Sequence, residues 1–245
     1  MWKIKPLNLG KLETSKNGLT FGKGNGEKQE VPCIGWLLTN AKGEVVLVDP
    51  GPSDDEQWGT KYHNPFKKKD EQRLENVLRN DGFDPDDIKI CILTHLHWDH
   101  AYGALKLHNA KIIVQSQELR YAVDPLPPDQ KHYETNIKDR KPFFLDFYQQ
   151  IETISGDCQI GNGLKVVHLP GHSPGSQGVV VTTEMGDYLI AGDLINIMEN
   201  WNSHPRIPPG IFYSLEDCYR SFAKIENLKV NVLPGHDWLA FEQFT

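Results

Sequence analysis

The sequence has few of the features that mark secreted or disulfide-stapled proteins. Its 245 residues include only four cysteines, which show neither CxxC pairing nor regular spacing: Cys33, Cys91, Cys158 and Cys218. Two of them lie inside apolar runs. The pattern predicts buried free thiols in a reducing compartment.

Long apolar runs and basic blocks are also missing. No stretch reaches the roughly 20 apolar residues that span a bilayer, and residues 1–6 contain no signal-peptide core. A net charge of −7 without a basic block argues against a nucleic-acid surface. We therefore expect a cytoplasmic monomer or homodimer that acts on a small-molecule substrate, with no nucleic acid or membrane as partner.

Turn residues divide the chain into short apolar segments. The expected strands are 31–39, 44–48, 88–93, 111–115, 158–169, 178–183, 188–191 and 229–233, and the expected helices are 72–80 and 215–225. Residues 53–70 are polar without periodicity and are expected to form a long loop. Periodicity alone predicts a mixed α/β protein.

The most informative stretch is His-Leu-His-Trp-Asp-His at 95–100, directly after the apolar run 90–93. Neutral imidazole nitrogen and carboxylate oxygen are the ligands that Zn²⁺ and related ions prefer. A short loop of this kind can direct His95 and His97 to one metal ion, and Asp99 and His100 to a second ion beside it.

One loop cannot complete two metal sites, so further ligands must come from elsewhere in the chain. His172, Asp193 and His236 each follow an apolar run and stand next to glycine. Glycine permits the sharp turn that points a side chain back over a sheet edge. These three residues are therefore the remaining ligand candidates.

Taken together, these residues resemble the metallo-β-lactamase superfamily. The matching motifs are His-x-His-x-Asp-His at 95–100, Pro-Gly-His at 170–172, Gly-Asp at 192–193 and Pro-Gly-His at 234–236. The resemblance extends from about residue 31 onward. It implies an α/β fold of the αβ/βα sandwich type, with two packed mixed β-sheets flanked by helices and metals at the sheet edges.

The resemblance also implies a domain organisation. We expect one metallo-β-lactamase-like domain over 1–245, with an N-terminal strand and loop at about 1–30. Two segments broken by prolines, 117–150 and 196–212, are expected to be insertions that flank the active site.

A dinuclear centre follows from the same resemblance. It implies that His95, His97 and His172 hold the first ion, that Asp99, His100 and His236 hold the second, and that Asp193 bridges them. Two such ions, roughly 3.5–4 Å apart, activate a bridging hydroxide for attack on a carbonyl. Asp99 is expected to pass a proton to the leaving group, so Asp99 and Asp193 are the predicted catalytic residues. Zinc is the first expectation for both ions, with manganese, cobalt or iron as alternatives.

Asp49 is the expected partner of a ligating imidazole. It ends the apolar run 45–48, and an Asp-x-Gly like the one it begins recurs in the superfamily. A carboxylate there can orient a ligand through the other ring N–H. Among the remaining histidines, His63, His108 and His132 are expected to be solvated, and His168 to be structural.

The closest resemblance within the superfamily is to the N-acyl homoserine lactonase group. It rests on His-Leu-His-Trp-Asp-His-Ala at 95–101, on Leu-Pro-Gly-His-Ser-Pro-Gly-Ser-Gln-Gly at 169–178, and on Glu118 soon after the strand 111–115. The predicted activity is the opening of a lactone ring, either of an N-acyl homoserine lactone or of another small lactone. Many of those lactonases carry tyrosine where this chain has Asn196.

The expected substrate pocket lies around the metal ligands. Trp98 sits inside the metal loop, and Asn196 follows the bridging aspartate. Three further candidates, Trp201, His204 and Arg206, come from the next loop, where an arginine can bind a substrate carboxylate.

Three other functions share parts of this pattern. A glyoxalase II-type thioesterase has all of the metal residues, but such enzymes usually continue into a helical extension, and this chain continues for nine residues after His236. A phosphodiesterase of the superfamily is expected to show a basic groove. A non-catalytic binding protein often lacks metal ligands, and none is missing here.

Overall fold

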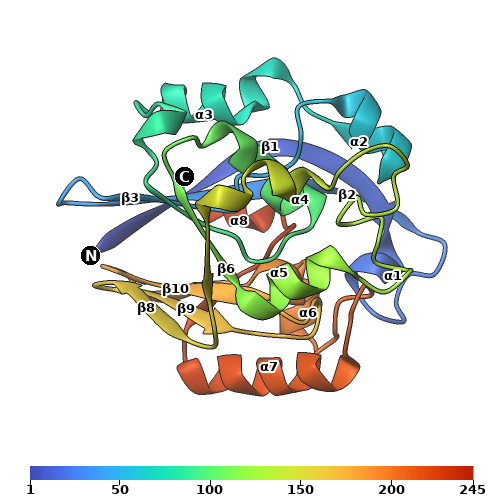
Figure 1. Ribbon diagram of the computed structural model, residues 1–245. Helices are drawn as coiled ribbons and strands as arrows, with labels where there is room; N and C mark the ends of the chain where they lie inside the picture. The colour runs from blue at the N-terminus through green and yellow to red at the C-terminus, as the bar shows by residue number, and fades with distance from the viewer. Residues whose placement is uncertain (245) are drawn as a thin grey trace.

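Two mixed β-sheets form the centre of the computed structural model, which describes residues 1–244 (Figure 1). The seven strands of the first sheet lie in the order β4-β1-β2-β3-β5-β6-β7, and the five of the second in the order β12-β11-β10-β9-β8. The first sheet comprises β1 (Trp2–Ser15), β2 (Lys28–Asn40), β3 (Val45–Val48), β4 (Phe66–Lys67), β5 (Ile90–Ile92), β6 (Lys111–Gln115) and β7 (Ile151–Ile154). The second comprises β8 (Cys158–Gly161), β9 (Leu164–His168), β10 (Gln177–Thr183), β11 (Gly186–Ile190) and β12 (Asn231–Leu233).

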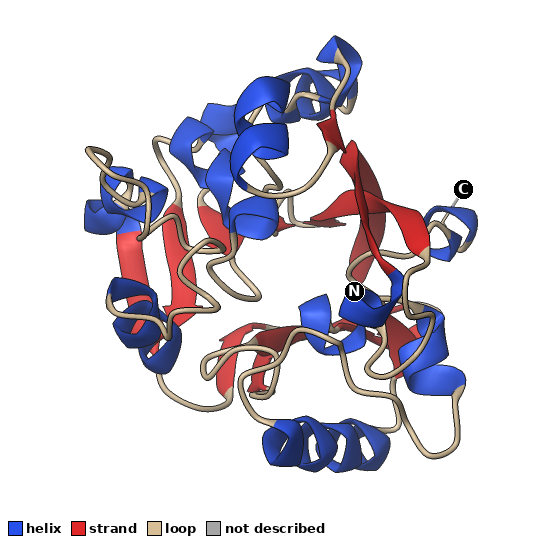
Figure 2. Ribbon diagram, turned by 90° about the vertical axis from the view of Figure 1, so that its right-hand side faces the viewer, coloured by secondary structure: helices blue, strands red, loops and turns tan. Residues whose placement is uncertain are grey.

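Helices cover the outer faces of both sheets (Figure 2). The α-helices are α1 (Lys16–Leu19), α2 (Glu56–Tyr62), α3 (Leu74–Asn80), α4 (Trp98–Ala101), α5 (Ser116–Val123), α6 (Met198–Asn202), α7 (Leu215–Leu228) and α8 (Leu239–Glu242). Short 3₁₀ helices are η1 (Asp70–Gln72), η2 (Pro85–Asp87), η3 (Tyr102–Lys106), η4 (Phe143–Asp146), η5 (Tyr148–Gln150) and η6 (Gly192–Ile195).

Strand β2 shows why the sheets pack as layers. Ile34, Trp36 and Leu38 point into the cluster between the two sheets, whereas Cys33 and Leu37 point into the cluster under the outer helices. Successive strand residues face opposite sides, so a strand that is apolar on both faces must be covered on both.

Helix α7 covers the outer face of the second sheet. Its residues Cys218, Phe222 and Ile225 recur at helical spacing and pack in one cluster with Val167 of β9 and Leu189 of β11. The helix begins at the Ser214 cap and ends at Lys229 in the left-handed conformation.

Parallel pairing brings the candidate ligands to one edge of the sandwich. Strands β3 and β5 are parallel neighbours, so Asp49 and His95, which follow them, lie at the same edge. Strands β11 and β12 are likewise parallel, and Asp193 and His236 follow them. The carboxyl ends of parallel strands meet at one sheet edge, which is where ligand sites form in open α/β sheets.

The structure confirms the predicted fold class. All the expected strands are present, and the expected segment 158–169 is a hairpin of β8 and β9. The expectation of a long loop over 53–70 was wrong, because this range contains α2 and β4. Asp55 caps α2, and the rings of Trp58 and Tyr62 lie 4.1 Å apart on this helix. The helix was missed because its sequence shows no aliphatic residues at helical spacing.

Three of the four cysteines have the burial expected of them. All four cysteines are free; Cys33, Cys91 and Cys218 are buried and Cys158 is half-buried. Within residues 1–244, no helix has the length and apolar character needed to cross a membrane.

Replacement of Leu47 by alanine tests the core. Leu47 is fully buried at the centre of the first sheet, and truncating such a leucine typically costs about 2–5 kcal/mol. We expect a loss of unfolding free energy in this range for Leu47→Ala in urea denaturation. Leu126 is 52% exposed, so Leu126→Ala should stay within about 0.5 kcal/mol of the parent protein. Equal effects in the two variants would contradict the assignment of Leu47 to the core.

Candidate metal centre

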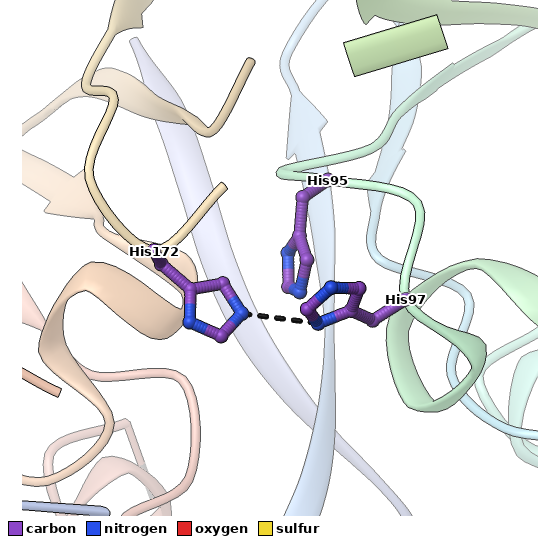
Figure 3. Close-up of side chains that lie close together, drawn as sticks. All are labelled: His95, His97 and His172. Carbon is purple, nitrogen blue, oxygen red and sulfur yellow. Dashed lines mark hydrogen bonds between the residues drawn. The ribbon is translucent and has the colours of Figure 1, made fainter. Parts of the chain in front are cut away.

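Two loops from opposite sheets bring three imidazoles together. Figure 3 shows His95 and His97, from the loop after β5, facing His172 from the loop after β9. The Nδ1 of His97 lies 3.0 Å from the Nε2 of His172, and one nitrogen of each ring lies within 4.8 Å of the others. All three side chains are buried. This is the set expected for the first ion.

A second cluster lies beside the first and contains Asp99, His100 and His236. The Nε2 atoms of His100 and His236 are 3.1 Å apart. The Oδ2 of Asp99 lies 3.6 Å from the Nε2 of His236 and 3.9 Å from that of His100. This is the set expected for the second ion.

Asp193 lies between the two clusters. Its Oδ1 is 3.0 Å from the Nε2 of His100 and 3.1 Å from that of His236, and its Oδ2 is 3.6 Å from the Nε2 of His172. One oxygen therefore faces the second cluster and the other faces the first, which is the placement that a bridging carboxylate requires.

Glycines make this close approach possible. Gly192, just before Asp193, has a φ of +55°, a conformation that side chains with a Cβ rarely adopt. Gly235, just before His236, would place a Cβ 2.8 Å from the Oδ1 of Asp193. A larger residue there would push the carboxylate away from the ligand cluster.

The outer nitrogens of the imidazoles are held by the protein. His100 donates its Nδ1 hydrogen to Asp49 at 2.9 Å, His172 donates to the carbonyl of Ile211 at 2.8 Å, and His236 donates to that of Pro32 at 2.8 Å. A neutral ring that donates from Nδ1 carries a lone pair on Nε2. These bonds therefore turn the Nε2 lone pairs of all three rings toward the centre, as outer partners of metal-bound histidines do.

Asp49 lies behind the ring of His100. Its Oδ2 accepts from His100, and its two oxygens also accept from the backbone N–H and the hydroxyl of Thr94, both at 2.7 Å. The Thr94 hydroxyl lies 3.0 Å from the Nδ1 of His95. Asp49 itself has a φ of +52°, an uncommon conformation of the kind that collects at functional sites.

The donor set fits divalent cations. The Nε2 of His95 and the Oδ1 of Asp193 are buried without a hydrogen-bond partner among the described residues. Because His100 and His236 use their hydrogens on Asp49 and Pro32, their neutral rings present lone pairs to the Oδ1 of Asp193. Buried lone pairs that face one another are unfavourable unless a cation lies between them.

The pKa shifts also indicate that the carboxylates of the site favour positive charge beside them. Burial opposes ionisation of His100, yet Asp193, Asp99 and Asp49 raise its pKa well above the ordinary value. Burial of Asp193 is likewise outweighed by His100 and His236, which hold its pKa well below the usual range. Burial lowers the pKa of His95 and His97. A metal ion supplies positive charge to neutral imidazoles, so binding should release protons.

Glu118 ties the two ligand loops together. One of its oxygens accepts from the backbone N–H of Leu96 at 2.9 Å and the hydroxyl of Tyr133 at 2.8 Å. The other accepts from the hydroxyl of Ser173 at 2.5 Å and the N–H of Gly175 at 3.2 Å. A fully buried carboxylate with four donors fixes the loop of His95 and His97 against that of His172.

Two histidines expected to be solvated are buried beside the centre. The ring of His132 stacks on that of His97, with centroids 4.7 Å apart, and burial lowers its pKa to about 3. The side chain of His63, only 1% exposed, stacks on Trp98 at 4.2 Å. Both lie in polar segments of the sequence, so no local pattern predicts their burial. His108 is exposed, as expected.

The cavity over the ligands receives two of the predicted pocket residues, Trp98 and Asn196. Its volume is about 50 Å³. Its apolar wall is formed by Leu12, Leu19, Val31, Trp98 and Ile211, and its polar wall beyond the ligands by Thr14, Asn64, His132 and Asn196. No lysine or arginine is among its lining residues.

The other three predicted pocket residues do not line this cavity. Arg206 forms an ion pair with Glu226 at 3.2 Å, and its guanidinium lies 3.8 Å over the ring of Trp201. Trp201 packs toward Phe222 of α7, and His204 is exposed. The prediction placed them by their nearness to Asp193 in sequence, but α6 and the following turn carry them away over α7.

Comparisons with known proteins place this geometry in a family. The family model described as the metallo-beta-lactamase superfamily matches residues 31–236. The N-acyl homoserine lactonase AiiA of Bacillus thuringiensis subsp. kurstaki is 34% identical over 224 residues, which cover 86% of this chain and 84% of the relative. The N-acyl homoserine lactonase AttM of Azorhizobium caulinodans is 28% identical over 252 residues, which cover 97% and 95%.

Solved structures agree on the fold. An N-acyl homoserine lactone hydrolase with N-hexanoyl-L-homoserine at its catalytic metal centre superposes with a TM-score of 0.82 at 24% identity, covering 98% of this chain and 95% of that one. AidC, a dizinc quorum-quenching lactonase, superposes with a TM-score of 0.70 at 16% identity, covering 97% and 88%.

Metal analysis tests the ligand assignment. We expect purified protein to hold about two equivalents of divalent metal per chain. His97→Ala and Asp193→Ala should each lower that number, because each removes a donor that faces the ions. His204→Ala, which changes an exposed histidine outside the cavity, is the matched control. A full metal count in Asp193→Ala, measured by elemental analysis after dialysis, would contradict the bridging role.

Proposed function

The chain belongs to the metallo-beta-lactamase superfamily, and from this premise we propose that it is a dinuclear metal-dependent lactonase. The proposal joins three observations: a full set of seven donors arranged around two positions, a cavity wall without lysine or arginine, and relatives named as N-acyl homoserine lactonases. The donor set carries the hydrolase part of the proposal, and the other two carry the substrate class.

The residues have distinct parts in the proposed reaction. When bound, two divalent ions would polarise the lactone carbonyl and lower the pKa of a water molecule toward neutrality. The chain holds that arrangement rigid, through Asp49 behind His100 and Glu118 between the loops. Asp99, whose side chain is 13% exposed beside His100 and His236, is the carboxylate proposed to carry a proton to the leaving oxygen.

An uncharged substrate suits the cavity better than a phosphodiester. Phosphate groups are recognised by arginine, lysine or backbone N–H groups, and the cavity wall has no lysine or arginine. Lactones and thioesters carry no charge at the reacting carbonyl. A thioesterase is therefore the remaining alternative, and the names of the relatives favour the lactone.

The cavity also favours a compact substrate. Its volume is about 50 Å³, far below the several hundred Å³ of typical pockets for drug-sized ligands. The side chain of Asn196 donates to the carbonyl of Leu19 at 3.0 Å, so one of its two amide N–H groups is used within the protein. We propose that the ring and carbonyl are bound inside and that a longer arm lies outside.

A substrate panel tests the proposed function. Metal-replete protein should hydrolyse lactones, with kcat/KM that does not rise when an N-acyl arm is lengthened. Each methylene buried from water would contribute about 0.8 kcal/mol, and an arm outside the cavity gains no such term. Protein stripped of metal is the control. Absence of lactone turnover, with clear cleavage of a thioester or a phosphodiester, would assign the chain to another activity of the superfamily.

Replacement of Asp99 by asparagine tests the proton transfer. General acid–base groups typically contribute about 10²–10⁴-fold to the rate, and asparagine has similar size but carries no transferable proton. We expect kcat to fall within this range when the assay is run at saturating metal, with little change in the melting temperature. An unchanged kcat in metal-replete Asp99→Asn would remove this role from Asp99.

A further inference from the structure

Some polar side chains of the cavity wall already form hydrogen bonds within the protein, and others do not. The amide of Asn64 donates to the carbonyl of Glu13 at 3.1 Å, and that of Asn196 donates to the carbonyl of Leu19 at 3.0 Å. One N–H of each amide therefore has a protein partner. The imidazole of His132 forms no hydrogen bond with any residue in 1–244, although His132 is buried and only 8% exposed.

The backbone of His132 is firmly held. Its N–H donates to the carbonyl of Asp129 at 2.9 Å, and its carbonyl accepts from the N–H of Trp98 in the metal loop at 3.1 Å. Its ring stacks on His97 at an interplanar angle of 27°. The imidazole thus lines the cavity beside the first ligand cluster, with its nitrogens unused by the protein.

The next two residues fix this segment from behind. Tyr133 donates its hydroxyl hydrogen to Glu118 at 2.8 Å. Glu134 accepts from the Nε1 of Trp58 at 2.7 Å and lies 2.9 Å from the Nε2 of His63. Three successive side chains therefore point to three different partners, and the only one that faces the cavity is His132. Such a fixed group costs little ordering on binding.

We propose that His132 is a substrate-binding residue whose imidazole donates a hydrogen bond to an oxygen of the bound lactone. The inference rests on the proposed lactonase function and adds a group that is not a metal ligand. An imidazole N–H at a cavity wall without lysine or arginine supplies the directional contact that an uncharged substrate can use. The stack on His97 fixes the position of the His132 ring beside the metal ligands.

The test compares two substitutions at this position. His132→Phe keeps an aromatic ring on His97 and removes both nitrogens, whereas His132→Gln restores an N–H donor. With metal content matched, we expect His132→Phe to lower kcat/KM for the lactone roughly tenfold, the size of one lost hydrogen bond, and His132→Gln to recover part of the loss. His108→Phe changes an exposed histidine and should leave kcat/KM unchanged.

Two results would overturn the inference. One is a kcat/KM in His132→Phe within about twofold of the parent protein. The other is an equal loss in the Phe and Gln variants at matched metal content, which would assign His132 to packing on His97. If the parent protein cleaves no lactone, the proposed function fails separately. The same pair is then measured on the substrate that is cleaved, and equal kcat/KM values there would overturn the role of His132.

Discussion

The structure depends on a buried excess of electron pairs that only cations can satisfy. The Nε2 atoms of His100 and His236 and the Oδ1 of Asp193 lie about 3 Å from one another, and the Nε2 of His95 is buried without a partner. In a medium of low dielectric, such groups repel one another or take up protons. Asp193 and Asp99 raise the pKa of His100 against the effect of burial, so uptake of a proton by His100 relieves this repulsion when no metal is bound. Bound metal ions relieve it as well.

Most of the surrounding architecture keeps these groups from moving apart. Parallel strand pairs deliver Asp49 beside His95, and Asp193 beside His236, from two separate sheets. Hydrogen bonds behind the rings prevent them from rotating outward to solvent. Glu118 then joins a loop of the first sheet to a loop of the second through backbone N–H groups, so the relative position of the two halves of the site is itself hydrogen-bonded.

The candidate metal ligands could be named from the sequence because each stands in a local pattern: an apolar strand, a glycine and a donor of the right chemistry. The fold class followed from those motifs through their resemblance to a superfamily. The burial of His132 and His63 was not predictable, since each ring stacks on a ring from a distant segment of the chain. Arg206 shows the opposite error. It is near Asp193 in sequence, but it pairs with Glu226 and covers Trp201, because helix α6 turns the chain away from the cavity.

The candidate ligands and the residues of the cavity wall come from different parts of the fold. The candidate ligands lie at strand ends of the sandwich, where the strands leave little freedom, and the proposed hydrolysis rests on them. The cavity wall comes from β1, from α1 and from the segment around His132, which together supply Leu12, Leu19 and the imidazole beside His97. These side chains line the cavity but are not among the candidate ligands, so their replacement is expected to change substrate preference while the metal centre stays intact. Relatives that share the motifs can therefore differ in substrate, and the wall, which has no lysine or arginine, is the better guide to what this protein binds.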